Sequence, residues 1–254
     1  MASKVFSAAV IGLDCELVEV EADVSNGMAN FSVVGLPDTA VQESRERVRS
    51  AIKNSDLPFP RGRVTVNLAP ADIRKQGPVY DLPMAVSLLL CQEEEWGKHI
   101  DWKTSLFIGE LALDGAVRGV GGILSVTLMA EKRGIKTLYV PSANAKEASL
   151  IEGVEVIPVH TFLELVDHLS GRKAIEPSRE RYTLEPDGTP ASHDMSNIRG
   201  QEHVKRALEI CAAGAHNILM SGPPGSGKTF LARALQTILP DLTLDEALEI
   251  TRVY

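Results

Sequence analysis

The chain has 254 residues, a hydrophobic content of 44% and a formal net charge of −8. This length and composition exclude an intrinsically disordered chain and are sufficient for one large domain or two ordinary ones. The acidic balance excludes a broad electropositive surface, so any contact with nucleic acid requires a local patch or a ring of subunits.

The three cysteines, Cys15, Cys91 and Cys211, are scattered and lack the spacing of a zinc site or a disulfide framework. They favour a reducing, cytoplasmic location. The six histidines offer no HxH or HExxH geometry, so we expect no transition metal bound by the protein. No apolar run approaches the roughly 18 to 20 residues that a membrane-spanning helix needs, and we expect no membrane partner.

The first part of the chain predicts a mixed α/β domain over residues 1–169. Alternating or β-branched apolar residues predict strands at 5–11, 13–20, 31–36, 64–68, 106–113 and 137–140. Helical spacing of apolar residues predicts helices at 39–54, 81–90, 122–133 and 162–169. Asp38 or Thr39 should cap the first helix, and Asp81 should open the second.

Residues 170–195 have almost no apolar periodicity and contain three prolines, which predicts a linker. After it, the apolar spacing predicts helices at 201–213, 227–239 and 243–251 and a short strand at 217–220. Residues 196–254 therefore indicate the beginning of a second α/β domain.

One motif in this second domain carries chemistry. It fits the pattern G-x-x-x-x-G-K-[ST] between an expected strand and an expected helix, and its residues are Gly222, Pro223, Pro224, Gly225, Ser226, Gly227, Lys228 and Thr229. Such a loop binds phosphates because its glycines let backbone N–H groups converge on them. Lys228 would pair with the β- and γ-phosphates of ATP, and the Thr229 hydroxyl would ligate Mg²⁺. The alternative is a structural glycine-rich turn.

Hydrolysis of ATP needs more than this loop. It also needs an acidic residue at the end of a second strand, to hold the metal, and an arginine that stabilises the transition state. No apolar strand ending in an acidic pair follows Thr229. We therefore assign no catalytic residue within this chain and expect it to bind nucleotide poorly and to hydrolyse hardly any.

Several stretches closely resemble the ComM/YifB family of bacterial magnesium-chelatase-like AAA+ ATPases. They are GLPDTAVQESRERVRSAI at 35–52, VNLAPADIRKQG at 66–77, DLPMA at 81–85, and 198–247 with the phosphate loop. The resemblance covers the whole chain. It implies an N-terminal domain with the fold of the Lon proteolytic domain, followed by the first part of an AAA+ module that assembles into a hexameric ring. The remaining motor residues would lie beyond Tyr254.

The resemblance also implies roles. Ile198 to Gln201 would lie against the adenine, as the corresponding segment does in related AAA+ modules. Members of the ComM type are associated with ATP-driven DNA branch migration during natural transformation. The leading hypothesis is thus an ATP-driven DNA motor that acts on branched or single-stranded DNA as a homo-hexamer, with this truncated chain itself inactive.

Two other functions stay open. The first is a chelatase subunit that drives Mg²⁺ into a tetrapyrrole; against it, we expect likeness to the true chelatase subunit only after about residue 195. The second is a non-catalytic interaction module, in which a degenerate Lon-like domain docks partners and carries an AAA+ stub.

A protease is the competing enzyme for the Lon-like part. Lon uses a serine nucleophile that follows Gly-Pro and a lysine that follows Gly-Gly and one apolar residue. Here Val79 follows Gly77-Pro78, and Leu124 follows Gly121-Gly122-Ile123. Neither side chain can attack a peptide or accept a proton, and we expect no proteolysis. Two nearby hydroxyls, Ser87 and Ser125, have no evident base.

A basic cluster precedes and follows the Pro58-Phe59-Pro60 stretch, and its members are Arg45, Arg47, Arg49, Lys53, Arg61 and Arg63. It could contact DNA or another subunit, although interleaved acidic residues favour a solvated helix face. Asp72, Arg74 and Lys75 lie in a polar loop and are expected to anchor that loop.

Overall fold

The computed structural model describes residues 2–92, 97–178 and 194–252. The chain separates into two compact units, one built on residues up to Tyr182 and the other on Thr183–Thr251. Much of the linker expected at 170–195 lies outside the described residues. The domain limits 1–169 and 196–254 stay predictions, and each unit is described by itself.

The first unit combines strands and helices, which confirms the mixed α/β class. Its strands are β1 (Ala2–Ile11), β2 (Asp14–Ser25), β3 (Asn30–Val34), β4 (Arg63–Ala69), β5 (Ser105–Phe107), β6 (Glu110–Leu111), β7 (Val117–Arg118), β8 (Thr137–Pro141) and β9 (Glu155–Val159). Its helices are α1 (Thr39–Asn54), α2 (Asp81–Leu90), α3 (Ile123–Lys132), α4 (Ala145–Ala148) and α5 (Phe162–Leu169), with the 3-10 turns η1 (Pro78–Tyr80) and η2 (Ser142–Asn144).

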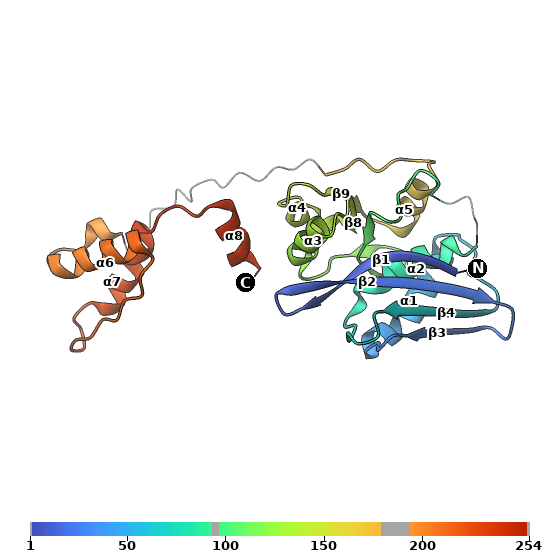
Figure 1. Cartoon of the computed structure of the whole chain (residues 1–254), viewed down its shortest axis with the longest axis horizontal. Helices are drawn as coiled ribbons and strands as arrows, with labels where there is room; N and C mark the ends of the chain where they lie inside the picture. Colours follow the sequence, from blue (N-terminus) through green and yellow to red (C-terminus); the bar gives the residue numbers. More distant parts are fainter. Residues whose placement is uncertain (1, 93–96, 179–193, 253–254) are drawn as a thin grey trace. The chain divides into compact units, whose positions relative to one another are not determined.

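The central sheet has seven strands in the order β3-β4-β2-β1-β5-β8-β9 (Figure 1). Pairing is antiparallel between β1 and β2 and between β2 and β4, and parallel between the other neighbours. A tight turn joins β1 to β2 with Ile11 opposite Asp14, and Gly12 in this turn has a φ of 64°. Glycine accepts that left-handed conformation without a steric penalty.

The two faces of the sheet bury separate apolar clusters, because successive side chains of a strand point to opposite faces. Phe107 and Tyr139 belong to the cluster that includes residues of α1, α2 and α5. Their neighbours Leu106 and Leu138 belong to the cluster with α3 and α4. This period of two is the physical basis on which the strands were predicted.

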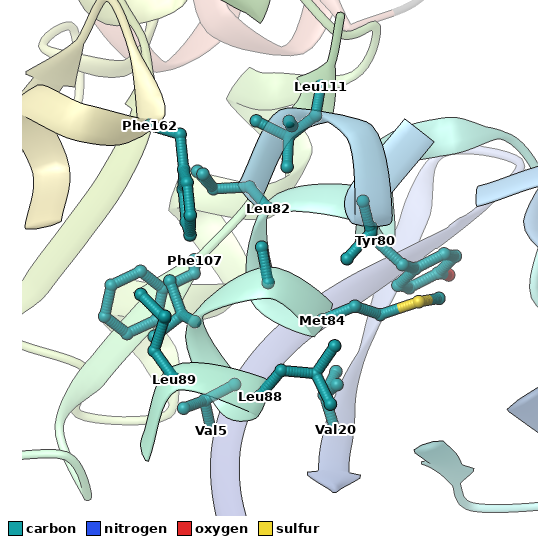
Figure 2. Packing of buried hydrophobic residues seen from close by; sticks show 14 of the residues in the cluster. Val5, Val20, Tyr80, Leu82, Met84, Leu88, Leu89, Phe107, Leu111 and Phe162 are labelled. Atoms are coloured by element: carbon teal, nitrogen blue, oxygen red, sulfur yellow. The ribbon is translucent and has the colours of Figure 1, made fainter. Parts of the chain in front are cut away.

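Helix α2 lies within the larger cluster, and every residue from Asp81 to Leu89 is buried. Figure 2 shows Met84, Leu88 and Leu89 of this helix packed with Val5, Val20 and Phe107 from the sheet. A helix that is apolar on all sides is stable only when it is buried on all sides. The predicted bounds of α2, 81–90, are confirmed.

The N-terminus of α1 is capped as expected by Asp38. One carboxylate oxygen accepts the backbone N–H of Val41 at 2.8 Å, and the other accepts the N–H of Gly77 at 3.1 Å. One side chain therefore both starts a helix and holds the loop that precedes α2.

The strand predicted at 106–113 is interrupted at Gly109. The Gly109 N–H donates to the carbonyl of Val79, and its carbonyl accepts the N–H of Leu82. A Cβ at this glycine would lie 3.0 Å from a methyl of Val117. The chain thus leaves the central sheet to bond to the start of α2, and residues 110–111 pair with β7 instead. Strands β7 and β9 were not predicted.

The second unit contains η3 (Met195–Asn197), α6 (Glu202–Gly214), α7 (Lys228–Ala234), η4 (Leu235–Ile238) and α8 (Leu244–Thr251). Its core is small: Ile198, Leu208, Leu231 and Ala234 are buried together. The helix predicted at 227–239 is α-helical only to Ala234 and continues as a 3-10 turn. The helices predicted at 201–213 and 243–251 are confirmed within one residue at each end.

The strand predicted at Asn217–Met220 is absent from the structure. Ile218 and Met220 are half-buried and Leu219 is 95% exposed, which is the alternation that a strand requires. A strand also needs a neighbour to bond its backbone, and residues 194–251 contain no paired strand. Residues 217–220 therefore have the apolar pattern of a strand but lack the backbone hydrogen bonds to a neighbouring strand.

None of the helices in the described ranges has the length and apolarity that crossing a membrane requires.

Candidate nucleotide-binding site

The glycine-rich loop of the second unit ends in α7, which begins at Lys228. Gly225 and Gly227 have φ angles of 78° and 83°, values that residues with a Cβ rarely adopt. A Cβ at Gly225 would meet no atom within 4 Å, so its requirement for glycine is conformational. The N–H of Leu231 donates to the Gly227 carbonyl at 2.9 Å and closes the first helical turn.

Lys228 folds back over its own loop. Its ammonium donates to the carbonyls of Gly222 at 2.8 Å and Pro223 at 2.9 Å, with the Ser226 hydroxyl 3.4 Å away. The side chain is half-buried. The positive charge of Lys228 therefore lies within the loop, where neutral oxygen atoms hold it. The negatively charged oxygens of an anionic ligand can take the place of these atoms and form stronger bonds to the ammonium.

A cavity of about 350 Å³ lies beside this loop, within the range of roughly 300–1,000 Å³ typical of small-molecule sites. Its lining comes from four segments: the start of α6, residues 218–221, the loop itself and Leu231 of α7. Of the predicted site residues, those that line it are Gln201, Gly222, Pro223, Ser226 and Lys228.

The remaining predicted residues lie elsewhere. Ile198 is buried with Leu208 and Leu231 in the core of the unit and is not part of the cavity wall. Thr229 is exposed on the first turn of α7. Pro224, Gly225 and Gly227 shape the loop without lining the cavity.

The sequence did not predict the other eight lining residues as site residues; they are His203, Val204, Ala207, Ile218, Leu219, Met220, Ser221 and Leu231. Among those that lie on α6, His203 and Ala207 are four positions apart and therefore share one helix face. Because the sequence predicts this helix, their mutual spacing could have identified them as neighbours.

In the first unit, the two positions that correspond to a protease dyad are apolar. Val79 packs against both apolar clusters, and Leu124 is 2% exposed. The Ser87 hydroxyl donates to the carbonyl of Met84 at 2.8 Å, and Ser125 donates to a carbonyl at 3.2 Å. These hydroxyls bond to backbone oxygens rather than to a base.

Three members of the basic cluster have contacts within the fold. Arg45 donates to the carbonyls of Gln42 at 2.8 Å and Phe31 at 3.4 Å. Arg47 forms an ion pair with Asp81, with Nε 2.6 Å from Oδ2 and Nη2 3.2 Å from Oδ1, and the Asp81 side chain is completely buried. Burial raises the pKa of Asp81, and the hydrogen bond from Arg47 opposes that rise. Arg49 lies over the ring of Phe59 at 5.1 Å, a cation–π contact. The guanidinium groups of Arg47 and Arg49 thus contact side chains within the unit, which favours a structural role over DNA binding.

The loop before α2 is anchored as expected by Lys75, which is fully buried. Its ammonium donates to the Pro70 carbonyl, its N–H donates to the Leu36 carbonyl at 3.2 Å, and its carbonyl accepts the N–H of Asp38 at 3.1 Å. Burial lowers the pKa of Lys75.

Over the described ranges, no group of three or more His, Cys, Asp or Glu side chains has the arrangement of a metal site.

Comparison with known proteins adds family evidence to this geometry. A family model described as subunit ChlI of Mg-chelatase matches residues 20–144, and a second, described as magnesium chelatase, subunit ChlI, matches residues 194–254. The expectation that chelatase likeness is confined to the part after about residue 195 is therefore wrong.

Curated relatives match nearly the whole chain. It is 40% identical over 251 residues to the competence protein ComM of Haemophilus influenzae, which covers 98% of this chain and 49% of ComM. It is 42% identical over 247 residues to the uncharacterized protein YifB of Escherichia coli, covering 97% of this chain and 48% of YifB. The chain thus spans about half the length of these relatives.

A more distant match connects the chain with a protease. It is 25% identical over 184 residues to the Lon protease of Koribacter versatilis, covering 67% of this chain and 22% of that protein.

Proposed function

Because this chain belongs to the ComM/YifB family of magnesium-chelatase-like proteins, we propose that it binds MgATP at Gly222–Thr229 and that the intact protein is an ATP-driven DNA motor. One observation carries the nucleotide assignment. Two left-handed glycines shape a loop around the Lys228 ammonium, beside a cavity of about 350 Å³. A structural turn would need neither the lysine nor the cavity.

The residues present fit this ligand. The Lys228 ammonium exchanges its contacts with the Gly222 and Pro223 carbonyls for the β- and γ-phosphates, and backbone N–H groups of the loop bind the β-phosphate. The Thr229 hydroxyl holds the Mg²⁺ that accompanies the nucleotide. MgATP supplies the phosphoanhydride bond whose hydrolysis drives a motor.

The motor activity belongs to the intact protein. We propose that residues 1–169 form a non-proteolytic Lon-like domain, that 170–195 link it to the AAA+ part at 196–254, and that the intact protein forms a hexameric ring. A ring supports DNA binding by an acidic protein because it repeats a local contact around a closed circle of subunits. The choice of DNA as the substrate rests on the resemblance to the ComM type; one relative is named a competence protein.

A chelatase-type ATPase is the second candidate, because both family models carry the chelatase subunit's description. A non-catalytic docking module is the third outcome.

Steady-state ATPase assays on the intact protein separate these functions. A rate that rises with branched DNA supports the motor, and Lys228→Ala should abolish both the basal and the stimulated rate. Stimulation by a porphyrin and chelatase partner subunits, with none by DNA, would replace the motor with the chelatase. No ATPase activity under either condition would favour the docking module.

A further inference from the structure

Gln201 lies at the junction between α6 and the phosphate loop, in an unusual backbone conformation. Its φ and ψ are 56° and 42°, in the left-handed region, and it is the N-cap residue of α6. Residues with a Cβ adopt this conformation at a cost, which persists only where the surrounding structure requires it. The Gln201 carbonyl accepts the N–H groups of Val204 at 2.9 Å and Lys205 at 3.1 Å, so the residue itself starts the helix.

This conformation places the side-chain amide against the phosphate loop. The Nε2 group of Gln201 donates to the carbonyl of Ser226 at 3.1 Å. A Cβ built on Gly227 would lie 3.9 Å from the same nitrogen, so the amide lies beside the second left-handed glycine. The contact joins residues 25 positions apart in the sequence.

The bond fixes the direction of one peptide group. In a planar trans peptide the C=O and the following N–H point in opposite directions. When Gln201 holds the Ser226 carbonyl on its own side, the N–H of Gly227 must point to the other side of the loop. Gly227 has no Cβ to restrict its φ, so this bond narrows the directions that its N–H can take.

We propose that Gln201 is a positioning residue of the phosphate-binding site, which orients the Ser226–Gly227 peptide for a triphosphate rather than contacting the adenine. The inference rests on the proposed nucleotide function and deepens it. Gln201 then serves the phosphates of the ligand. Its bond orders the loop before the anion binds, which lowers the entropy cost of ordering the loop on binding.

Three substitutions separate the amide from the backbone strain. Gln201→Glu keeps the length but replaces the donor with an acceptor. Gln201→Asn keeps the amide and tolerates the left-handed conformation but is one methylene shorter. Gln201→Gly removes the side chain and relieves the strain. Gln236→Asn is the matched control, because Gln236 is exposed on η4 and does not line the cavity.

Affinity for MgATP and for magnesium tripolyphosphate should be measured by calorimetry on the 254-residue chain and its variants. Loss of one hydrogen bond predicts that Gln201→Asn and Gln201→Gly bind both ligands roughly three- to tenfold more weakly, with Gln236→Asn unchanged. Gln201→Glu should bind them more weakly still, because its carboxylate repels the phosphates. Gln201→Gly should retain or raise the Tm, which excludes simple destabilisation. If MgATP binding is weakened and tripolyphosphate binding is unchanged, Gln201 contacts the adenine, and the proposal is overturned.

The contact between Gln201 and the loop can also be tested without any ligand. Hydrogen–deuterium exchange of the segment 222–229 should be faster in Gln201→Glu than in the wild type and in Gln236→Asn. If the wild type binds neither ligand but this exchange difference is found, the nucleotide function fails while the positioning contact stands. Equal exchange and equal affinities in Gln201→Glu and the wild type would refute the inference.

Discussion

The ion pair between Arg47 and Asp81 allows a direct test of whether the basic cluster serves the fold or a partner. Arg47→Met keeps most of the side-chain volume and removes the charge. Asp81 is completely buried and would lose both contacts with the guanidinium, keeping the N–H of Leu111 at 3.2 Å. Breaking a buried pair by removing one partner costs about 3–5 kcal/mol, because it leaves an uncompensated buried charge.

The lower end applies because the Arg47 side chain is 21% exposed, so we expect a loss of about 3 kcal/mol in the free energy of unfolding. For a unit of this size that loss lowers the Tm by about 6–12 °C. Thermal unfolding followed by circular dichroism measures this loss. The exposed Lys53→Met on the same helix is the control, with an expected change within about 0.5 kcal/mol. The double variant Arg47→Met with Asp81→Leu should lose less than Arg47→Met alone. A loss below about 1 kcal/mol for Arg47→Met would refute the structural reading of this arginine.

The remaining predictions concern a histidine and the metal ligand. His168 accepts the N–H of Ile175 on Nδ1 at 2.9 Å, and burial, followed by the nearby His99, lowers its pKa. The neutral form of His168 therefore stabilises the fold when the pH is above the ordinary histidine pKa of about 6.5. This contribution is lost as the pH falls from there through the lower pKa that His168 has in the folded state. His168→Gln should flatten the dependence of Tm on pH between about pH 7 and 5; an unchanged slope would contradict the assignment. Thr229→Ala should weaken binding of MgATP but not of ATP in EDTA, and calorimetry showing an equal loss for both would exclude Thr229 as a Mg²⁺ ligand.

Periodic apolar patterns made much of the first unit predictable. The fully apolar run at 81–90 indicated a buried helix, and the spacing after Asp38 indicated a capped amphipathic one; both have the expected bounds. The failures lie where a tertiary contact overrides the local pattern. Gly109 breaks a continuous apolar run because the segment before α2 bonds to it, which no local property of the sequence reveals.

The sequence predicts the motif of the candidate site but not the positions and contacts of the side chains around it. The spacing of the glycines, Lys228 and Thr229 identified the loop. The position of Ile198 beside an adenine stays a prediction, and the structure adds that its side chain is buried in the core. The contact between Gln201 and Ser226 depends on the left-handed conformation of one residue. Sequence patterns do not encode that conformation for a glutamine.

The central claim is that the loop at Gly222–Thr229 binds MgATP. Calorimetric titration of MgATP into the intact protein tests it most directly, with Lys228→Ala measured in parallel. We expect saturable binding by the wild type, with an affinity that falls at least tenfold on removal of the ammonium, since hydrogen bonds to charged groups contribute roughly 1.5–3 kcal/mol. No heat from the wild type, or equal affinities for the two proteins, would contradict it.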